Sequence, residues 1–236
     1  MKREEIVCLA AIAMAVLAAG ASLAFPGQAS SQAGWGDTFT VDKKDFASSG
    51  SNEFFRLEPG YALVLAKGNE RLVITVLEET RLVDGVETRV VEERESKGGE
   101  LVEVSRNFFA FNTADHGVYY FGEEVDIYRN GKIAAHEGAW ESGKNGARFG
   151  LMMPGRPEVG ARFYQEVAPG VAMDRAEIVA LDASLKTPAG EFKGCLKIAE
   201  TTPLESGREY KLYAPGIGLI KDGSLLLVEH DRLEER

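Results

Sequence analysis

Residues 71–111 read RLVITVLEETRLVDGVETRVVEERESKGGELVEVSRNFFAF. Apolar side chains alternate with other residues from Leu72 to Val76, which is the period of a β-strand with one buried face. Asp84-Gly85 suits a type I′ turn, whose twist matches that of two antiparallel strands, and Lys97-Gly98-Gly99 marks a second turn. The stretch therefore predicts three neighbouring strands joined by two hairpins.

Turn signals continue on both sides of this stretch, at intervals of about eight to twelve residues. Asn130-Gly131 is the strongest hairpin signal, and Asp222-Gly223 joins the last two candidate strands. The predicted fold class is all-β, with a large antiparallel meander that forms a curved sheet or a partly open barrel. The other strands expected are 61–66, 118–121, 125–129, 132–140, 161–167, 172–182, 192–200, 209–213, 217–221 and 225–230.

The run from Trp140 to Asp174 fits neither a regular strand nor a helix. It contains six glycines and three prolines. Proline fixes φ and glycine supplies positive φ, so this composition specifies an irregular backbone path. We expect a long covering segment that lies over the sheet between two antiparallel halves.

The net charge of the chain disfavours some classes of partner. The chain has 236 residues, a formal net charge of −10 and a pI of about 5.0. A surface this acidic repels phosphate backbones and anionic lipid head groups. Nucleic-acid binding and electrostatic docking on a membrane are therefore disfavoured.

An uncharged apolar segment follows Lys2 and Arg3 near the N-terminus. Residues 1–27 are predicted to be a signal peptide cut after Ser22-Leu23-Ala24, or an uncleaved N-terminal membrane anchor. Both alternatives predict an exported protein that is periplasmic, on the cell surface or extracellular. Membrane contact is expected only through this segment.

Residues 28–51 are rich in Ser, Gly and Ala and are predicted to be a flexible linker, although Trp35, Phe39 and Phe46 could dock onto the domain. Residues 52–236 are predicted to form a single β domain. Since Cys195 is the one cysteine after the N-terminal segment, the domain cannot form an internal disulfide, and its stability must come from the core.

A set of short motifs spans residues 52–228 and closes with Tyr213-Ala214-Pro215-Gly216-Ile217-Gly218-Leu219-Ile220. Others are Leu57-x-Pro59-Gly60, Gly85-Val86-x-Thr88-Arg89-Val90, Gly138-x-Trp140-x-x-Gly143, Gly150-Leu151-x-Met153-Pro154 and Gln165-Glu166-x-x-Pro169-Gly170. Together they resemble a family of secreted bacterial β-rich proteins that has no established activity. The resemblance implies export and one β-rich domain, and it supplies no catalytic residues.

Five residues are the candidate ligand-binding set: Trp140, Met152, Met153, Tyr164 and Glu166. A curved sheet under a covering segment is a common site for an apolar ligand. We expect a contiguous apolar pocket bordered by Trp140, Met152 and Met153, which would hold an apolar small molecule or a lipid. The alternative is that these side chains only fill the core.

Glu166, Asp174 and Glu177 form an acidic cluster around Pro169-Gly170. Such carboxylates could serve as acid and base or bind a hard cation. Asp174 and Glu177 have opposite strand parity, so one of them at most can converge with Glu166. The alternative is structural: they accept hydrogen bonds from loop amides or pair with Arg162 or Arg175.

His136 and Cys195 are the remaining candidates for chemistry. His136 shares strand parity with Trp140, and Lys193 and Lys197 could lower the pKa of the Cys195 thiol. The three histidines lack metal-ligand spacing, and Cys195 has no placed histidine partner. We therefore expect structural roles, with no catalytic residue, no metal and no cofactor.

The sequence thus favours an exported binding or envelope-structural module over an enzyme. Its partner would be an apolar small molecule, a lipid or an envelope protein. Two alternatives stay open. One is a carboxylate- or metal-assisted hydrolase that uses Glu166 and Asp174, and the other is an interaction module that pairs through a sheet edge.

Overall fold

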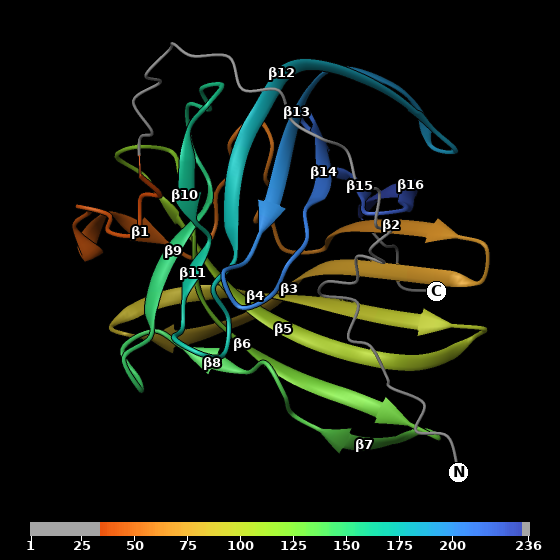
Figure 1. The fold of residues 1–236 in the computed structure, drawn as a ribbon, viewed down its shortest axis with the longest axis horizontal. Coiled ribbons are helices and arrows are strands. Elements are labelled where there is room, and N and C mark those ends of the chain that lie inside the picture. Colours follow the sequence, from red (N-terminus) through yellow and green to blue (C-terminus); the bar gives the residue numbers. More distant parts are fainter. Residues whose placement is uncertain (1–33, 233–236) are drawn as a thin grey trace, which may run out of the picture.

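The computed structural model describes residues 34–232, whose regular secondary structure is β-strand apart from one 3₁₀ turn, η1 (Lys43–Asp45). The strands build one antiparallel sheet that curves until it nearly closes, which makes the molecule barrel-like with one seam (Figure 1). The predicted all-β antiparallel class is confirmed.

The first half of the sheet is a meander of β2 (Tyr61–Lys67), β3 (Glu70–Val83), β4 (Val86–Lys97), β5 (Glu100–Asn112) and β6 (Val118–Arg129). Val83 pairs with Val86 and Lys97 pairs with Glu100, so both hairpins expected in residues 71–111 are confirmed. Asp84 and Gly85 have φ of 49° and 78°, as a type I′ turn requires.

Gly122 bends β6 without ending it. Two strands are expected here, but the structure has one, with a register shift opposite Phe108 and Phe109. A Cβ on Gly122 would stand 2.6 Å from the carbonyl oxygen of Trp140, so only glycine lets β8 (Trp140–Glu141) approach this closely. The glycine marks a bulge.

The single strand expected over 132–140 is wrong, because the chain forms two short strands there. β7 (Lys132–Ala135) and β8 both pair with β6, and the segment between them contains Gly138 at a φ of 95°. A left-handed residue interrupts the extended path.

The second half of the sheet comprises β12 (Arg175–Thr187), β13 (Gly190–Thr201), β14 (Glu209–Ala214), β15 (Gly218–Asp222) and β16 (Leu225–Arg232). These strands also pair in chain order. β16 returns to β2, where Leu226 pairs with Ala66, and so joins the two halves into one sheet.

The Gly/Pro-rich run forms the seam. Besides β8, it contains β9 (Arg148–Met153), β10 (Arg162–Tyr164) and β11 (Glu166–Val167). β10 pairs with β12 at one end of the sheet, whereas β11 pairs with β9 at the other. Gln165 is therefore the residue at which the chain crosses from one end of the sheet to the other.

Residues 34–51 pack against the sheet, although a flexible linker is expected over 28–51. β1 (Phe46–Ala47) pairs with β5, and the Phe46 ring meets Tyr119 and Phe121 edge-on at 5.2 Å. These aromatic contacts hold the segment on the sheet, although its Ser/Gly-rich composition is typical of a flexible linker.

Two apolar clusters lie on opposite faces of the sheet. The larger one fills the inner face and includes Phe109, while Phe108 belongs to a smaller cluster on the other face, which Phe39 and Phe46 cover. The predicted signal or anchor, residues 1–27, lies outside the described residues. Among those described, no helix has the length and apolarity to cross a membrane.

Candidate ligand-binding cavity

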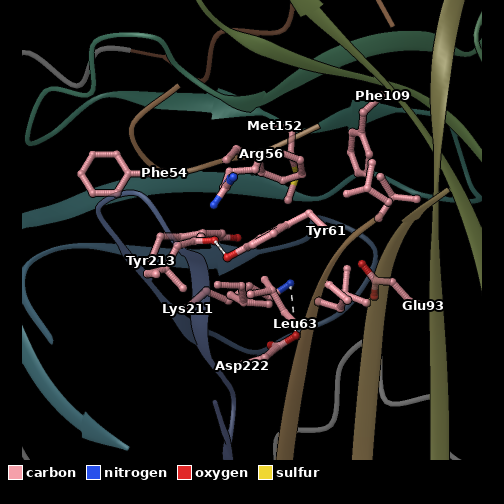
Figure 2. Close-up of a pocket in the computed structure, with 18 residues that line it drawn as sticks. Phe54, Arg56, Tyr61, Leu63, Glu93, Phe109, Met152, Lys211, Tyr213 and Asp222 are labelled. Atoms are coloured by element: carbon pink, nitrogen blue, oxygen red, sulfur yellow. Dashed lines mark hydrogen bonds and ion pairs between the residues drawn. The ribbon is translucent and has the colours of Figure 1, made fainter. Parts of the chain in front are cut away.

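A cavity of about 80 Å³ lies on the inner face of the sheet, where the two halves face each other (Figure 2). Its apolar wall is shared between Leu63, Val76, Val91 and Phe109 of β2–β5 and Tyr213 and Leu219 of β14 and β15. Phe54, Phe55 and Met152 complete the wall. A cavity of this volume suits a small ring with a short arm.

One end of this cavity is charged. Lys211 Nζ lies 3.0 Å from Glu200 Oε2 and 3.7 Å from Asp222 Oδ2, and Figure 2 shows the ammonium pointing at Asp222. Burial lowers the pKa of Lys211, but Asp222 and Glu200 outweigh burial, and the pKa lies well above its ordinary value. Lys211 is therefore protonated at neutral pH.

Glu93 enters the same end from β4. It has the strand parity of Val91, so it faces inward with the apolar wall. Its carboxyl makes no hydrogen bond or ion pair with any described residue. Burial raises the pKa of Glu93 to about 7, with Lys211 opposing the rise and Asp222 adding to it.

Arg56 lies at the other end. Its guanidinium is 4.1 Å from the centre of the Tyr61 ring, and its Nε is 2.6 Å from Glu58 Oε2. The Tyr61 hydroxyl donates to the carbonyl oxygen of Ile217 at 2.9 Å. These contacts tie the segment before β2 to the turn between β14 and β15, and they hold the apolar wall together.

More carboxylates continue along the inner face from this cavity. In the strand register, Glu95 of β4 lies opposite Glu103 of β5, and Glu123 of β6 lies opposite Asn107 of β5. Burial, and then the charges of Glu103 and Glu93, raise the pKa of Glu95 to about 8. Burial also raises the pKa of Glu123 to about 8. The inner face carries a surplus of acidic groups.

Glu166 and Asp174 line a second cavity of about 350 Å³, together with Glu103 and Glu123. Glu166 Oε1 accepts a hydrogen bond of 2.9 Å from the backbone N–H of Asp174. Burial and then Asp174 raise the pKa of Glu166 well above its usual value, and burial raises that of Asp174 to about 6. The described residues include no group of three or more His, Cys, Asp or Glu arranged to hold a metal ion.

Gln165 connects the seam to the charged end of the first cavity. It is buried, and its Nε2 donates to Glu200 Oε1 at 2.9 Å and contacts Met152 Sδ at 3.5 Å. Glu200 in turn pairs with Lys211. Closing the sheet and assembling the charged end are therefore coupled.

Comparison with models of known protein families and with curated proteins finds no match to the chain. Among solved structures, a Parabacteroides distasonis protein provisionally described as a lipoprotein is similar at 15% identity and a TM-score of 0.36. The alignment covers 78% of this chain and 100% of that one.

The five predicted ligand-binding residues are divided between several environments. Met152 lines the first cavity and Glu166 the second. Trp140 and Met153 are buried in the apolar core, where Trp140 meets Tyr120 edge-on at 5.2 Å. The guanidinium of Arg175 lies 5.9 Å from the centre of the Tyr164 ring. These residues therefore do not border one common pocket.

The structure also places the residues considered for chemistry. Glu177 pairs with Arg162 at 2.8 Å and Arg208 at 3.4 Å, as a structural carboxylate would. His136 Nδ1 lies 2.9 Å from Asp126 Oδ1, and its side chain is largely exposed. Cys195 is buried, and burial raises the pKa of its thiol, which opposes the activation suggested by its lysine neighbours.

Sequence reasoning missed Glu93 and Lys211. A signal for Glu93 exists, since it shares the strand parity of Val91, which is buried in the core. Lys211 likewise shares parity with the buried Tyr213. A charged residue in phase with a buried face is a candidate site residue.

Proposed function

We propose that this protein is an exported, non-catalytic binding protein whose first cavity holds a small molecule with an apolar body and a polar head. The N-terminal segment and the family resemblance support export. One observation carries the binding role: an apolar wall from both halves of the sheet ends at the polar side chains Glu93, Lys211 and Asp222. A few convergent polar groups on an apolar pocket are typical of small-molecule sites.

The size of the cavity limits the ligand. A space of about 80 Å³ admits a ring with a short arm, not the acyl chain of a membrane lipid. Of the expected partners, an apolar small molecule is therefore favoured over a lipid.

Calorimetry with 2-phenylethanol, 2-phenylethylamine and phenylacetate tests this role, since the three probes share one apolar body. We expect at least one of them to bind with a stoichiometry of about one. Val76→Phe, which fills the cavity from β3, should abolish that binding. The matched control is Leu82→Phe on the same strand, whose side chain is 73% exposed. If none of the probes binds, or if folded Val76→Phe binds as well as the wild type, the proposal fails.

A carboxylate-based hydrolase is the second candidate, because Glu166 and Asp174 share one cavity and both have raised pKa values. The hydrogen bond from Asp174 N–H to Glu166 also satisfies the structural alternative. Hydrolysis of chromogenic esters and glycosides that is lost in Glu166→Gln, but kept in Glu177→Gln, would favour the enzyme.

Pairing through a sheet edge is less favoured. Within the described chain, β12 pairs with β13 on one side, and residues 160–164 cover part of its other side. The rest of that other side is a sheet edge. That part of β12 has three register irregularities between Ile178 and Leu185. Irregularities of this kind protect an edge against association.

A further inference from the structure

We propose that the first cavity selects a small amine, whose ammonium group binds between Glu93 and Asp222 while its apolar body lies against Phe109 and Val76. This inference rests on the proposed function, because it names the ligand class of the same cavity. It follows from how the charges at the polar end are already paired.

Lys211 is not free to receive an anionic head group. Its ammonium is shared between Glu200 at 3.0 Å and Asp222 at 3.7 Å. A ligand carboxylate would add a further negative charge beside Glu200 and Asp222, whose one ammonium is already shared between them, and this is unfavourable in a partly buried site. Acidic ligands are therefore disfavoured at this end.

Glu93, in contrast, is available to bind a cationic head group. Its carboxyl faces the cavity without a hydrogen bond or ion pair to any described residue. The charged groups that influence it are Lys211 on β14, Asp222 on β15, Glu103 on β5 and Glu200 on β13, and only the first of these is a cation. The acidic groups at this end thus outnumber the cation, and a ligand ammonium would reduce the excess of negative charge.

The pKa of Glu93 supports this assignment. Burial raises it to about 7, so near neutral pH the carboxyl ionises at the expense of its desolvation. A cation within about 4–6 Å favours the ionised form and offsets that desolvation. An alcohol of the same shape gains a hydrogen bond there but no charge compensation, so it should bind more weakly.

Calorimetry with the three matched probes at about pH 7.5, where 2-phenylethylamine is protonated, tests the selection. We expect 2-phenylethylamine to bind about tenfold more tightly than 2-phenylethanol, and phenylacetate to bind most weakly. Glu93→Gln should remove most of the advantage of the amine while leaving the affinity for the alcohol unchanged. Glu92→Gln is the matched control. Glu92 is next to Glu93 in the chain, but its carboxylate pairs with Arg94 and Arg106.

The outcomes separate the two proposals. If the alcohol or phenylacetate binds as tightly as the amine, the amine selection is overturned and the binding role stands. If none of the three binds, the binding role itself fails. If Glu93→Gln does not fold, the ranking of the probes on the wild type still decides, and Asp222→Asn, which should also weaken the amine, replaces it.

Discussion

The backbone of Gly150 in β9 lies directly against the backbone of Gln165, so that a Cβ on residue 150 would stand 2.3 Å from the Gln165 carbonyl oxygen. Real Cβ atoms do not approach an oxygen this closely. Gly150 is thus the place where the seam of the sheet becomes narrow enough for Gln165 to reach Glu200.

Gly150→Ala should weaken the seam. Either β9 or the crossing at Gln165 must move, and overpacking of this kind lowers the free energy of unfolding by about 1–3 kcal/mol. Urea unfolding followed by tryptophan fluorescence measures the change. Gly34→Ala is the control, because a Cβ there meets nothing within 4 Å. Equal midpoints for the two variants would show that the seam is loose at this point.

Arg89 is a buried arginine whose described hydrogen bonds all go to backbone carbonyls. Its Nε donates to Ser48 O at 2.7 Å, and its Nη1 donates to Glu78 O at 2.7 Å. It therefore fastens the N-terminal segment to the irregular part of β3, between Val76 and Thr80. A guanidinium suits this role because its donors have a fixed fork geometry.

Arg89→Met should leave those carbonyls unsatisfied and lower the free energy of unfolding by about 3 kcal/mol. Limited proteolysis should also cut residues 46–51 faster, since Ser48 loses its anchor. Arg94→Met is the control: its side chain is 47% exposed and pairs with Glu92, so its loss should cost at most about 1 kcal/mol. Similar losses for both variants would contradict the anchoring role.

The hairpins could be predicted from the sequence because each depends on two or three adjacent residues. Asp84-Gly85 specifies a turn through the φ values that these residues tolerate, and the flanking strands follow from alternation. The bulge at Gly122 could not be distinguished from a strand end, because glycine weakens the strand pattern in both cases. Local chemistry alone cannot say what approaches the glycine.

The seam and the cavity depend on contacts between residues far apart in the chain. Gln165 meets Glu200, and the wall that carries Glu93 faces the wall that carries Lys211 only after β16 pairs with β2. Composition indicates that residues 140–174 are irregular, but it does not indicate that they join both ends of the sheet. Sequence reasoning therefore reached Met152 and Glu166 while missing the charged end of the cavity.

The inner carboxyls make stability depend on pH in an unusual direction. Burial raises the pKa of Glu93 to about 7 and those of Glu95 and Glu123 to about 8, above the ordinary value of 4.5. Between pH 4.5 and the raised pKa of about 7 or 8, these carboxyls still hold their protons in the folded chain but have released them in the unfolded chain. Raising the pH removes those protons from the folded state, so stability is greatest near pH 4.5 for these groups and is lost up to about pH 8.

Thermal unfolding should therefore show a melting temperature at about pH 5.5 that is higher than at about pH 8.5 by roughly 4 °C or more, given about 2–4 °C per kcal/mol for a domain of this length. Glu123→Gln cannot ionise, so it should raise the melting temperature at the higher pH and reduce the difference. Glu124→Gln is the control, since its side chain is half-exposed and pairs with Arg81. A wild-type protein that is as stable at pH 8.5 as at 5.5 would mean that the inner carboxyls are solvated or already paired with a bound cation. Repeating the scan with 2-phenylethylamine separates those two cases, because an added amine can only stabilise a site that is still unpaired.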